Sequence, residues 1–289
     1  MRKLRWLILA VIAAAVILMV IPFPHGLSRI SDHGSGEFER PVADAINVYC
    51  RKGTRPSVKY VSGTYEGVPY NVLEVKPDDH TFIQLDYAGE TPEYLDELYD
   101  HSSEYWHVGG INGGFFQNSG EEYGRPVGAL LIDGSWAQWK DQELTPAYGR
   151  GNATVYFNRD GNLKLAYHGW ENGEWKPVSD SFWSYNEEIV DYGYQIDTEY
   201  GLSGAYTLLR NGKRVWLGKN DSAYWNRSSD SWVTLFGETS DGTVLLVIAG
   251  KLGGGEAETE LMKQLDAVNA IRLDGNTSTC MTVDKGLVH

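Results

Sequence analysis

The sequence contains little cysteine and little positive charge. Cys50 and Cys280 are its two cysteines in 289 residues, so the chain is no disulfide scaffold, and whether these two form a bridge stays open. No cysteines and histidines occur at the close spacing of a zinc site. Against 39 Asp and Glu stand 25 Lys and Arg, a formal net charge of -14. Long-range repulsion therefore argues against nucleic acid or an anionic membrane surface as a partner, and an anionic substrate would need a local cationic pocket.

The sequence also lacks internal repeats, low-complexity tracts and a clear domain boundary. One large domain is therefore expected. The hydrophobic content of 42%, with 33 Gly and 18 Tyr, is typical of a strand-rich globular protein with many tight turns.

A long apolar run occurs at the N-terminus. Three cations at positions 2, 3 and 5 precede the run Trp6–Ile21, and Pro22 and Pro24 end any helix there. This pattern predicts an export signal with the body outside the cytoplasm. Because no small-x-small cleavage site follows, we expect an uncleaved signal anchor over residues 1–24. Cleavage of a signal peptide, and hence secretion, is the alternative.

The remaining chain is predicted to hold a linker leading into the domain over residues 25–55 and the domain itself over residues 56–289. Predicted strands cover residues 58–61, 68–75, 81–87, 105–111, 130–134, 153–157, 206–217, 244–249 and 268–273. Helices are predicted over 91–101 and 256–264, each between two strands. Such strand-helix-strand crossovers imply parallel pairing. The expected fold class is α/β (mixed α+β), with a mixed sheet, two crossovers and antiparallel hairpins.

Each predicted crossover ends in an unusual loop. The first runs into Gly109–Phe116 (GGINGGFF) and the second into Leu273–Thr279 (LDGNTST). Ligands of open parallel sheets collect beyond the carboxyl ends of the strands, so the two loops are predicted to share one site. The alternative is that the glycines only make tight turns.

Five segments occur in the order of the phosphodiester glycosidase family, which the chain resembles from Val68 to its C-terminus. They are Ile111–Phe116, Arg125–Gly134, Leu202–Lys213, Asp241–Val247 and Asn269–Gly275. The resemblance implies a hydrolase that cleaves the glycosidic bond of a sugar-1-phosphodiester. The implied substrate is an N-acetylglucosamine-like sugar on a phosphorylated glycan or polysaccharide of the envelope or the extracellular space, such as an exopolysaccharide.

The chain departs from the family pattern at two places. Asn276 and Thr277 stand where the family usually has glycines, and Val233–Gly237 lacks an arginine found in the corresponding family segment. If that arginine holds the phosphate in relatives, Arg227 or Arg125 is the candidate here. The departures favour an alternative, a membrane-tethered glycan-binding protein that has lost the chemistry. A third reading is an unrelated envelope assembly factor, with the two loops at opposite ends of the sheet.

Cleavage of a glycosyl phosphate places positive charge on the anomeric carbon, so the site needs a carboxylate and groups that hold the phosphate. Asp274, in the loop that matches the family, is the first carboxylate candidate, and its alternative role is an Asx turn. Glu238 is the second, and its alternative is a solvated hairpin residue. The predicted substrate-binding residues are Asn112, Gly113, Gly114, Arg125, Arg227, Thr234, Gly275, Ser278 and Thr279.

No cofactor is evident from the sequence, and no metal motif occurs in it. Calcium would be possible if Asp274, Glu238 and Asp241 converge. Whether the reaction retains or inverts the anomeric configuration depends on the carboxylate separation. The oligomeric state stays open.

Overall fold

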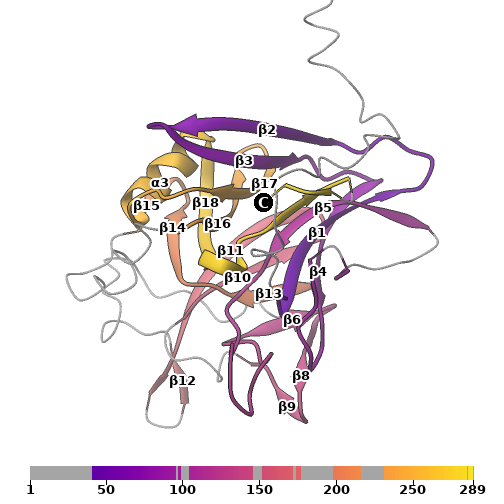
Figure 1. Cartoon of the computed structure of the whole chain (residues 1–289), viewed down its shortest axis with the longest axis vertical. Helices are drawn as coiled ribbons and strands as arrows, with labels where there is room; N and C mark the ends of the chain where they lie inside the picture. The colour runs from indigo at the N-terminus through magenta and orange to yellow at the C-terminus, as the bar shows by residue number, and fades with distance from the viewer. Residues whose placement is uncertain are drawn as a thin grey trace, which may run out of the picture. The chain divides into compact units, whose positions relative to one another are not determined.

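The computed structural model describes residues 41–95, 97–98, 104–145, 152–171, 174–176, 198–215, 231–284 and 286–288 (Figure 1). The chain divides into two units, Met1–Gly34 and Ser35–His289, and all described residues belong to the second. The predicted signal anchor therefore lies outside the described residues and stays a prediction. Within those residues, no helix combines the length and apolarity that a membrane span requires.

The described strands form three larger sheets and one two-stranded ribbon. The first sheet has the order β20 (Gly286–Leu287), β19 (Met281–Val283), β5 (Tyr105–Asn112), β1 (Asp44–Arg51) and β4 (Thr81–Tyr87). The second has the order β12 (Glu174–Lys176), β11 (Gly161–Glu171), β10 (Asn152–Asn158), β13 (Tyr200–Ser203), β6 (Leu130–Ile132) and β7 (Ser135–Trp136).

The third sheet contains the family-like C-terminal strands. Its order is β15 (Lys213–Arg214), β14 (Tyr206–Arg210), β18 (Ala267–Gly275), β16 (Val233–Thr239), β17 (Val244–Ala249), β3 (Val68–Val75) and β2 (Val58–Tyr65). The ribbon pairs β8 (Gln138–Trp139) with β9 (Gln142–Glu143). Helix α3 (Gly255–Gln264) and the 3-10 turn η5 (Asn276–Ser278) complete this part of the chain.

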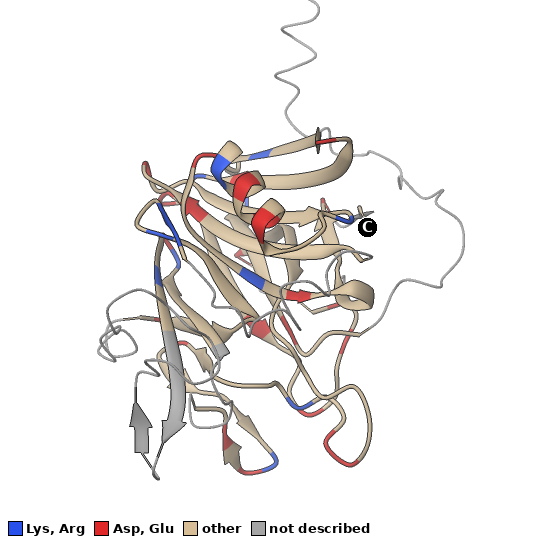
Figure 2. Cartoon of the chain, turned by 90° about the vertical axis from the view of Figure 1, so that its left-hand side faces the viewer, with Lys and Arg blue, Asp and Glu red and all other residues tan. Residues whose placement is uncertain are grey.

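Local sequence signals predicted several of these elements correctly. The β2–β3 hairpin turns at Glu66 and Gly67, whose φ angles of 49° and 84° lie in the left-handed region that such a turn requires. Helix α3 forms at the predicted place, and its acidic and basic residues can be followed in Figure 2. The strand-rich character of the prediction is confirmed.

The predicted parallel pairing is wrong, because every strand pair of the described chain is antiparallel. β17 and β18 flank α3 and run in the same direction, but β16 lies between them and pairs with both. In the same way, β1 lies between β4 and β5. Each predicted parallel pair is thus separated by a strand from elsewhere in the sequence (Figure 1).

Two further predictions differ from the structure. The segment expected as a helix over 91–101 has a β-bridge at Glu93 and a turn in which the Leu98 N–H donates to the Tyr94 carbonyl at 2.9 Å. Its described residues form no helix, and the others lie outside the described part. The expected linker over 25–55 contains β1, a strand buried along all but its last residue. An apolar strand covered on both faces shows no alternation, which is why sequence periodicity missed it.

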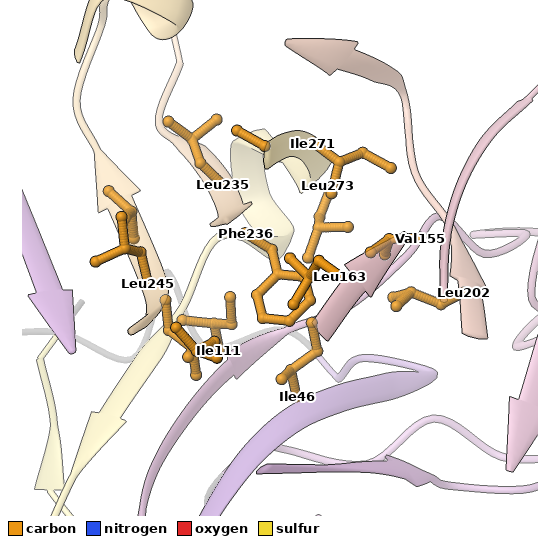
Figure 3. Packing of buried hydrophobic residues seen from close by; sticks show 14 of the residues in the cluster. Ile46, Ile111, Val155, Leu163, Leu202, Leu235, Phe236, Leu245, Ile271 and Leu273 are labelled. Carbon is orange, nitrogen blue, oxygen red and sulfur yellow. The ribbon is translucent and has the colours of Figure 1, made fainter. Parts of the chain in front are cut away.

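The hydrophobic core joins residues of all three sheets in one cluster. Figure 3 shows Ile46 of β1, Val155 of β10 and Leu273 of β18 converging on this core. Phe236 of β16 is fully buried, and its ring meets Phe157 edge-on at a centroid distance of 5.2 Å. Cys50 and Cys280 are both buried thiols that form no disulfide, so the bridge that the sequence left open is not formed.

Truncation of Phe236 to alanine is expected to lower the free energy of unfolding by about 3–5 kcal/mol, because it removes a fully buried ring from the shared core. Urea unfolding of both proteins measures this difference. Tyr123→Ala is the matched control, since Tyr123 is 43% exposed and its loss should cost less than about 0.5 kcal/mol. Equal effects of the two substitutions would contradict the assignment of the core.

Candidate functional site

The two glycine-containing loops meet at one place, as the sequence predicted. β5 ends at Asn112 and β18 carries Asp274 one residue before its end. β1 and β16, the strands that lie between the predicted parallel pairs, begin at the same place. Asp44 is the first residue of β1, and Thr234 is the second residue of β16. Four strand ends from two sheets thus supply the side chains of the candidate site.

The side-chain amide of Asn112 holds these strand ends together. Its Oδ1 accepts hydrogen bonds from the Thr234 hydroxyl at 2.6 Å and from the Cys280 N–H at 3.1 Å. Its Nδ2 donates to the main-chain oxygen of Asp274 at 3.1 Å. Asn112 is 1% exposed, so the amide that was predicted to bind substrate is already occupied by protein partners. Asn112 and Thr234 therefore hold the two loops in place through buried hydrogen bonds.

Gly113 and Gly114 allow a carboxyl group to lie directly against the main chain. A Cβ atom at Gly113 would lie 1.8 Å from Asp44 Oδ1, and one at Gly114 would lie 2.5 Å from the Ser203 carbonyl oxygen. Any side chain at these two positions would displace its neighbours. Gly113 and Gly114 are thus required because the Asp44 side chain and the Ser203 carbonyl lie so close to the loop, and not only because the chain turns there.

Asp274 is a half-buried carboxyl group surrounded by donors. Its Oδ1 accepts the N–H of Gly275 at 2.7 Å, and the Ser278 hydroxyl also hydrogen-bonds the carboxylate. Burial raises the pKa of Asp274 to about 6, while these two hydrogen bonds and the nearby charge of Arg272 act in the opposite direction. Asp274 therefore titrates close to neutral pH, in the range useful for catalysis.

Arg272 is the cation of this cluster, and the sequence analysis did not single it out. Its Nη1 donates to Glu258 of α3 at 2.9 Å and to the Tyr206 hydroxyl at 2.7 Å. The arginine side chain is 11% exposed and that of Glu258 0% exposed. A buried charge needs such partners, and the guanidinium that they fix is near enough for its charge to lower the pKa of Asp274.

Asp44 supplies a second carboxyl group. Its Oδ1 accepts the N–H of Gly114 at 2.7 Å, and the side chain is almost fully buried. Burial raises the pKa of Asp44 to about 7; the Gly114 N–H lowers it and the charge of Asp274 raises it further. Two carboxyl groups with raised pKa values thus face one glycine loop.

The loop from Gly275 to Thr279 carries side chains where the family usually has glycines. Asn276 has a φ of 63°, a left-handed conformation that asparagine tolerates better than most residues, and its side chain is exposed. Thr279 is 3% exposed, and its hydroxyl has no hydrogen-bond partner among the described residues. The substitution at Asn276 therefore fits the backbone conformation that glycine would otherwise supply.

The structure does not bring Glu238 into this cluster. Glu238 pairs with Asn269, five residues before Asp274 on β18, which is roughly 17 Å away along a strand. Its carboxylate accepts the N–H groups of Asn162 at 2.6 Å and Leu163 at 3.1 Å. Burial raises the pKa of Glu238, and these bonds lower it. The placement indicates that Glu238 connects two sheets.

The described residues place neither a predicted cation nor a calcium site at Asp274. Arg125 contacts Glu122 and lies with its guanidinium carbon 5.9 Å from the Trp139 ring centroid, and neither partner belongs to the Asp274 cluster. Arg227 lies outside the described residues. Within the described ranges, no three Asp, Glu, His or Cys side chains are placed to hold a metal ion. The convergence of Asp274, Glu238 and Asp241 that calcium would need is therefore not observed.

Sequence reasoning missed Asp44 and Arg272 for different reasons. Arg272 lies on the predicted strand over 268–273, two residues before Asp274, and this closeness in sequence was the available signal. Asp44 lay in the presumed linker. The apolar residues around it, from Val42 to Cys50, were the available sign of a buried strand.

Comparison with known proteins supports the resemblance found in the sequence. A model of the family described as phosphodiester glycosidase matches residues 107–289, more than half of the chain. The match includes Asn112, Arg272 and Asp274 but begins after Asp44. A comparison with curated proteins found no match.

The chain is similar to three solved structures to different extents. The zebrafish N-acetylglucosamine-1-phosphodiester alpha-N-acetylglucosaminidase catalytic domain, auto-inhibited by its pro-peptide, is similar with a TM-score of 0.51 and 16% identity, covering 86% of this chain and 80% of that one. A hypothetical protein from Synechocystis has a TM-score of 0.46 and 16% identity, and the match covers 80% of this chain and 58% of the other. A protein from Burkholderia pseudomallei whose title describes it as exported has a TM-score of 0.27 and 10% identity. That match covers 86% of this chain and 55% of the other.

Stability is expected to fall as pH rises from about 4 to about 7, because Asp44 and Asp274 bind protons more tightly in the folded chain than at the ordinary pKa of 3.8. In that window the folded state holds more protons than the unfolded state. Asp44→Asn removes one of the two penalties, so it should raise Tm at pH 8 by a few degrees and change Tm little at pH 4. Thermal unfolding from pH 4 to pH 8 measures both. An unchanged pH dependence in the variant would refute the raised pKa of Asp44.

Proposed function

Because the chain belongs to the phosphodiester glycosidase family, we propose that it hydrolyses the glycosidic bond between a sugar and phosphate in a sugar-1-phosphodiester. The observation that carries the proposal is Asp274, whose main chain is hydrogen-bonded to the Asn112–Gly114 loop and whose carboxyl group is half-buried near the end of β18. Its position lies inside the matched region, and its raised pKa suits proton transfer.

The chemistry follows from the charge that develops during cleavage. As the bond to phosphate breaks, positive charge grows on the anomeric carbon, and a carboxylate beside it lowers the energy of that state. In its ionised form Asp274 is the group that stabilises this carbon or activates water. The Ser278 hydroxyl and the Gly275 N–H hold the carboxylate in one orientation, so its placement costs little entropy during the reaction.

Arg272 acts on the reaction through Asp274. Its positive charge favours the ionised carboxylate, and its buried contacts with Glu258 and Tyr206 fix its own position. Arg272 is therefore a positioning residue, and it also offsets part of the negative charge that a phosphodiester would meet in this site. Arg227 remains a candidate for direct contact with the phosphate.

The name of the zebrafish relative suggests the substrate class, an N-acetylglucosamine-like sugar linked through phosphate. At 16% identity that relative supports the fold alone, so the sugar is part of the proposal. We place the substrate on a glycan of the envelope or the extracellular space. This location rests on the predicted signal anchor over residues 1–24, which would hold the domain outside the cytoplasm.

A second candidate function is binding of the same glycans without turnover. One observation favours it: the Asn112 amide and the Asp274 carboxylate both have hydrogen-bond partners within the protein, as structural residues do. Turnover by the wild-type chain separates the two functions.

Asp274→Asn is expected to lower kcat on a sugar-1-phosphodiester by at least about 100-fold, because the amide cannot carry the negative charge. The measurement is sugar release by the full chain from N-acetylglucosamine 1-(methyl phosphate) and from the simple methyl glycoside. Glu238→Gln is the control, since the structure places that carboxylate at the other end of β16.

The two variants distinguish the possible outcomes. Release from the phosphodiester that is lost in Asp274→Asn and kept in Glu238→Gln supports the proposal. Activity that survives Asp274→Asn would remove the central carboxylate from the mechanism. Binding of the phosphodiester by the wild type without any release would establish the glycan-binding alternative.

The double variant Arg272→Gln/Glu258→Gln is expected to move the acid limb of the pH–rate profile to higher pH. Without the guanidinium, the pKa of Asp274 rises, so the carboxylate ionises at a higher pH. Replacing both partners avoids an unpaired buried charge. An acid limb that does not move in the double variant would contradict this role of Arg272.

A further inference from the structure

Asp44 lies outside the region that the family model matches, yet its carboxyl group belongs to the site. It is 2% exposed and stands opposite Tyr87 in the register of β1 and β4. Its residue number places it in a segment that carries no sequence motif. The strand order brings it to the Asn112 end of β5, because Ala45 pairs with Asn112.

One glycine residue connects the main chains of Asp44 and Asp274. The Gly113 N–H donates to the main-chain oxygen of Asp44 at 2.9 Å, and the Gly113 carbonyl accepts the N–H of Asp274 at 3.1 Å. The Asp44 carboxyl group itself is bound through Oδ1 by the N–H of Gly114 at 2.7 Å. A proton on Asp44 therefore belongs on the other oxygen, Oδ2, which leaves that oxygen as a donor.

The surroundings of the two carboxyl groups differ. Asp274 has the cation Arg272 and the Ser278 hydroxyl beside it, and both favour its ionised form. Among the described residues, no cation contributes to the environment of Asp44. Its neighbours are Tyr87 across the strand pair, whose own pKa is raised by burial, Asp44 and Glu90, and the negative charge of Asp274. Near neutral pH these surroundings favour a proton on Asp44 and the ionised form of Asp274, because the guanidinium and the hydroxyl lie beside Asp274.

We propose that Asp44 is the general acid of the site and protonates the phosphate oxygen that leaves the sugar. This assignment rests on the proposed phosphodiester glycosidase activity. Two carboxyl groups in which one is protonated and the other ionised are the usual equipment for cleaving a glycosidic bond.

The proton and charge balance of the step is complete. The bond between the anomeric carbon and the bridging phosphate oxygen breaks, and its electron pair stays on the oxygen. Asp44 gives its proton to that oxygen, so the phosphomonoester leaves as a monoanion. A water oxygen bonds to the anomeric carbon and gives one proton to Asp274. One proton then returns from Asp274 to Asp44 before the next turnover.

A general acid is useful here although phosphate is a good leaving group. Without protonation the product would form as a dianion beside the ionised Asp274 and Glu258, with Arg272 as the cation in contact with Glu258. Like charges at such short range disfavour that product. Protonation by Asp44 removes one of its two negative charges at the moment it forms.

The test compares two leaving groups in the full chain, N-acetylglucosamine 1-(methyl phosphate) and N-acetylglucosaminyl fluoride. Fluoride leaves without a proton from an acid. Asp44→Asn is therefore expected to lower kcat on the phosphodiester by about 10²–10⁴-fold and to keep hydrolysis of the fluoride within about tenfold. Asp274→Asn should lose both. In Asp44→Asn the amide oxygen can still accept the Gly114 N–H, so the loop contact is preserved.

Two controls separate catalysis from folding. Asp86→Asn changes another carboxylate of the same sheet, one that accepts hydrogen bonds from Asn47 and Tyr49, and should affect both substrates to the same extent. Wild type alone gives a second readout if Asp44→Asn does not fold. Its activity on the phosphodiester should fall as pH rises through about 7, where Asp44 loses its proton, while activity on the fluoride should not.

The outcomes are distinct. Equal losses on both substrates in a folded Asp44→Asn variant, or equal alkaline limbs for both substrates in the wild type, would overturn the general-acid assignment and leave the proposed hydrolase intact. A wild-type chain that releases sugar from neither substrate would overturn the proposed function itself.

Discussion

The buried amide of Asn112 is the interaction on which the site depends. Its oxygen and nitrogen join β5 to β16, to the start of the last β-strands and to the main chain at Asp274. A buried amide that loses a partner costs about 1–3 kcal/mol, so these segments are held together as one unit. Gly113 then lies between Asp44 and Asp274 and hydrogen-bonds the main chain of both residues.

The same strand arrangement occurs in two of the sheets. In each half, two strands that run in the same direction are separated by an antiparallel strand, β1 in one sheet and β16 in the other. An inserted strand begins where its neighbours end. The candidate site therefore combines the carboxyl ends of β5 and β18 with the first residues of β1 and β16, and it gathers polar groups from four distant parts of the sequence.

The electrostatics of the site are local and differ from those of the chain. A formal net charge of -14 disfavours anions at long range, yet a phosphodiester is the proposed substrate. The buried pair Arg272–Glu258 contributes no net charge, and burial raises the pKa of both Asp44 and Asp274, which favours their neutral forms. The cluster thus has far less negative charge than its count of acidic residues suggests, because burial favours neutral and paired groups.

The sequence by itself determined the elements with strong local signals and the family to which the chain belongs. Short-range preferences and motifs can be recognised in the sequence alone. They predicted the hairpin at Glu66–Gly67, helix α3, and the loops at Asn112 and Asp274. Only the tertiary structure decided the antiparallel pairing and the parts played by Asp44, Arg272 and Glu238. These depend on which distant strands become neighbours, and on burial, which sets the charge state of each carboxyl group. Neither quantity is a local property of the sequence.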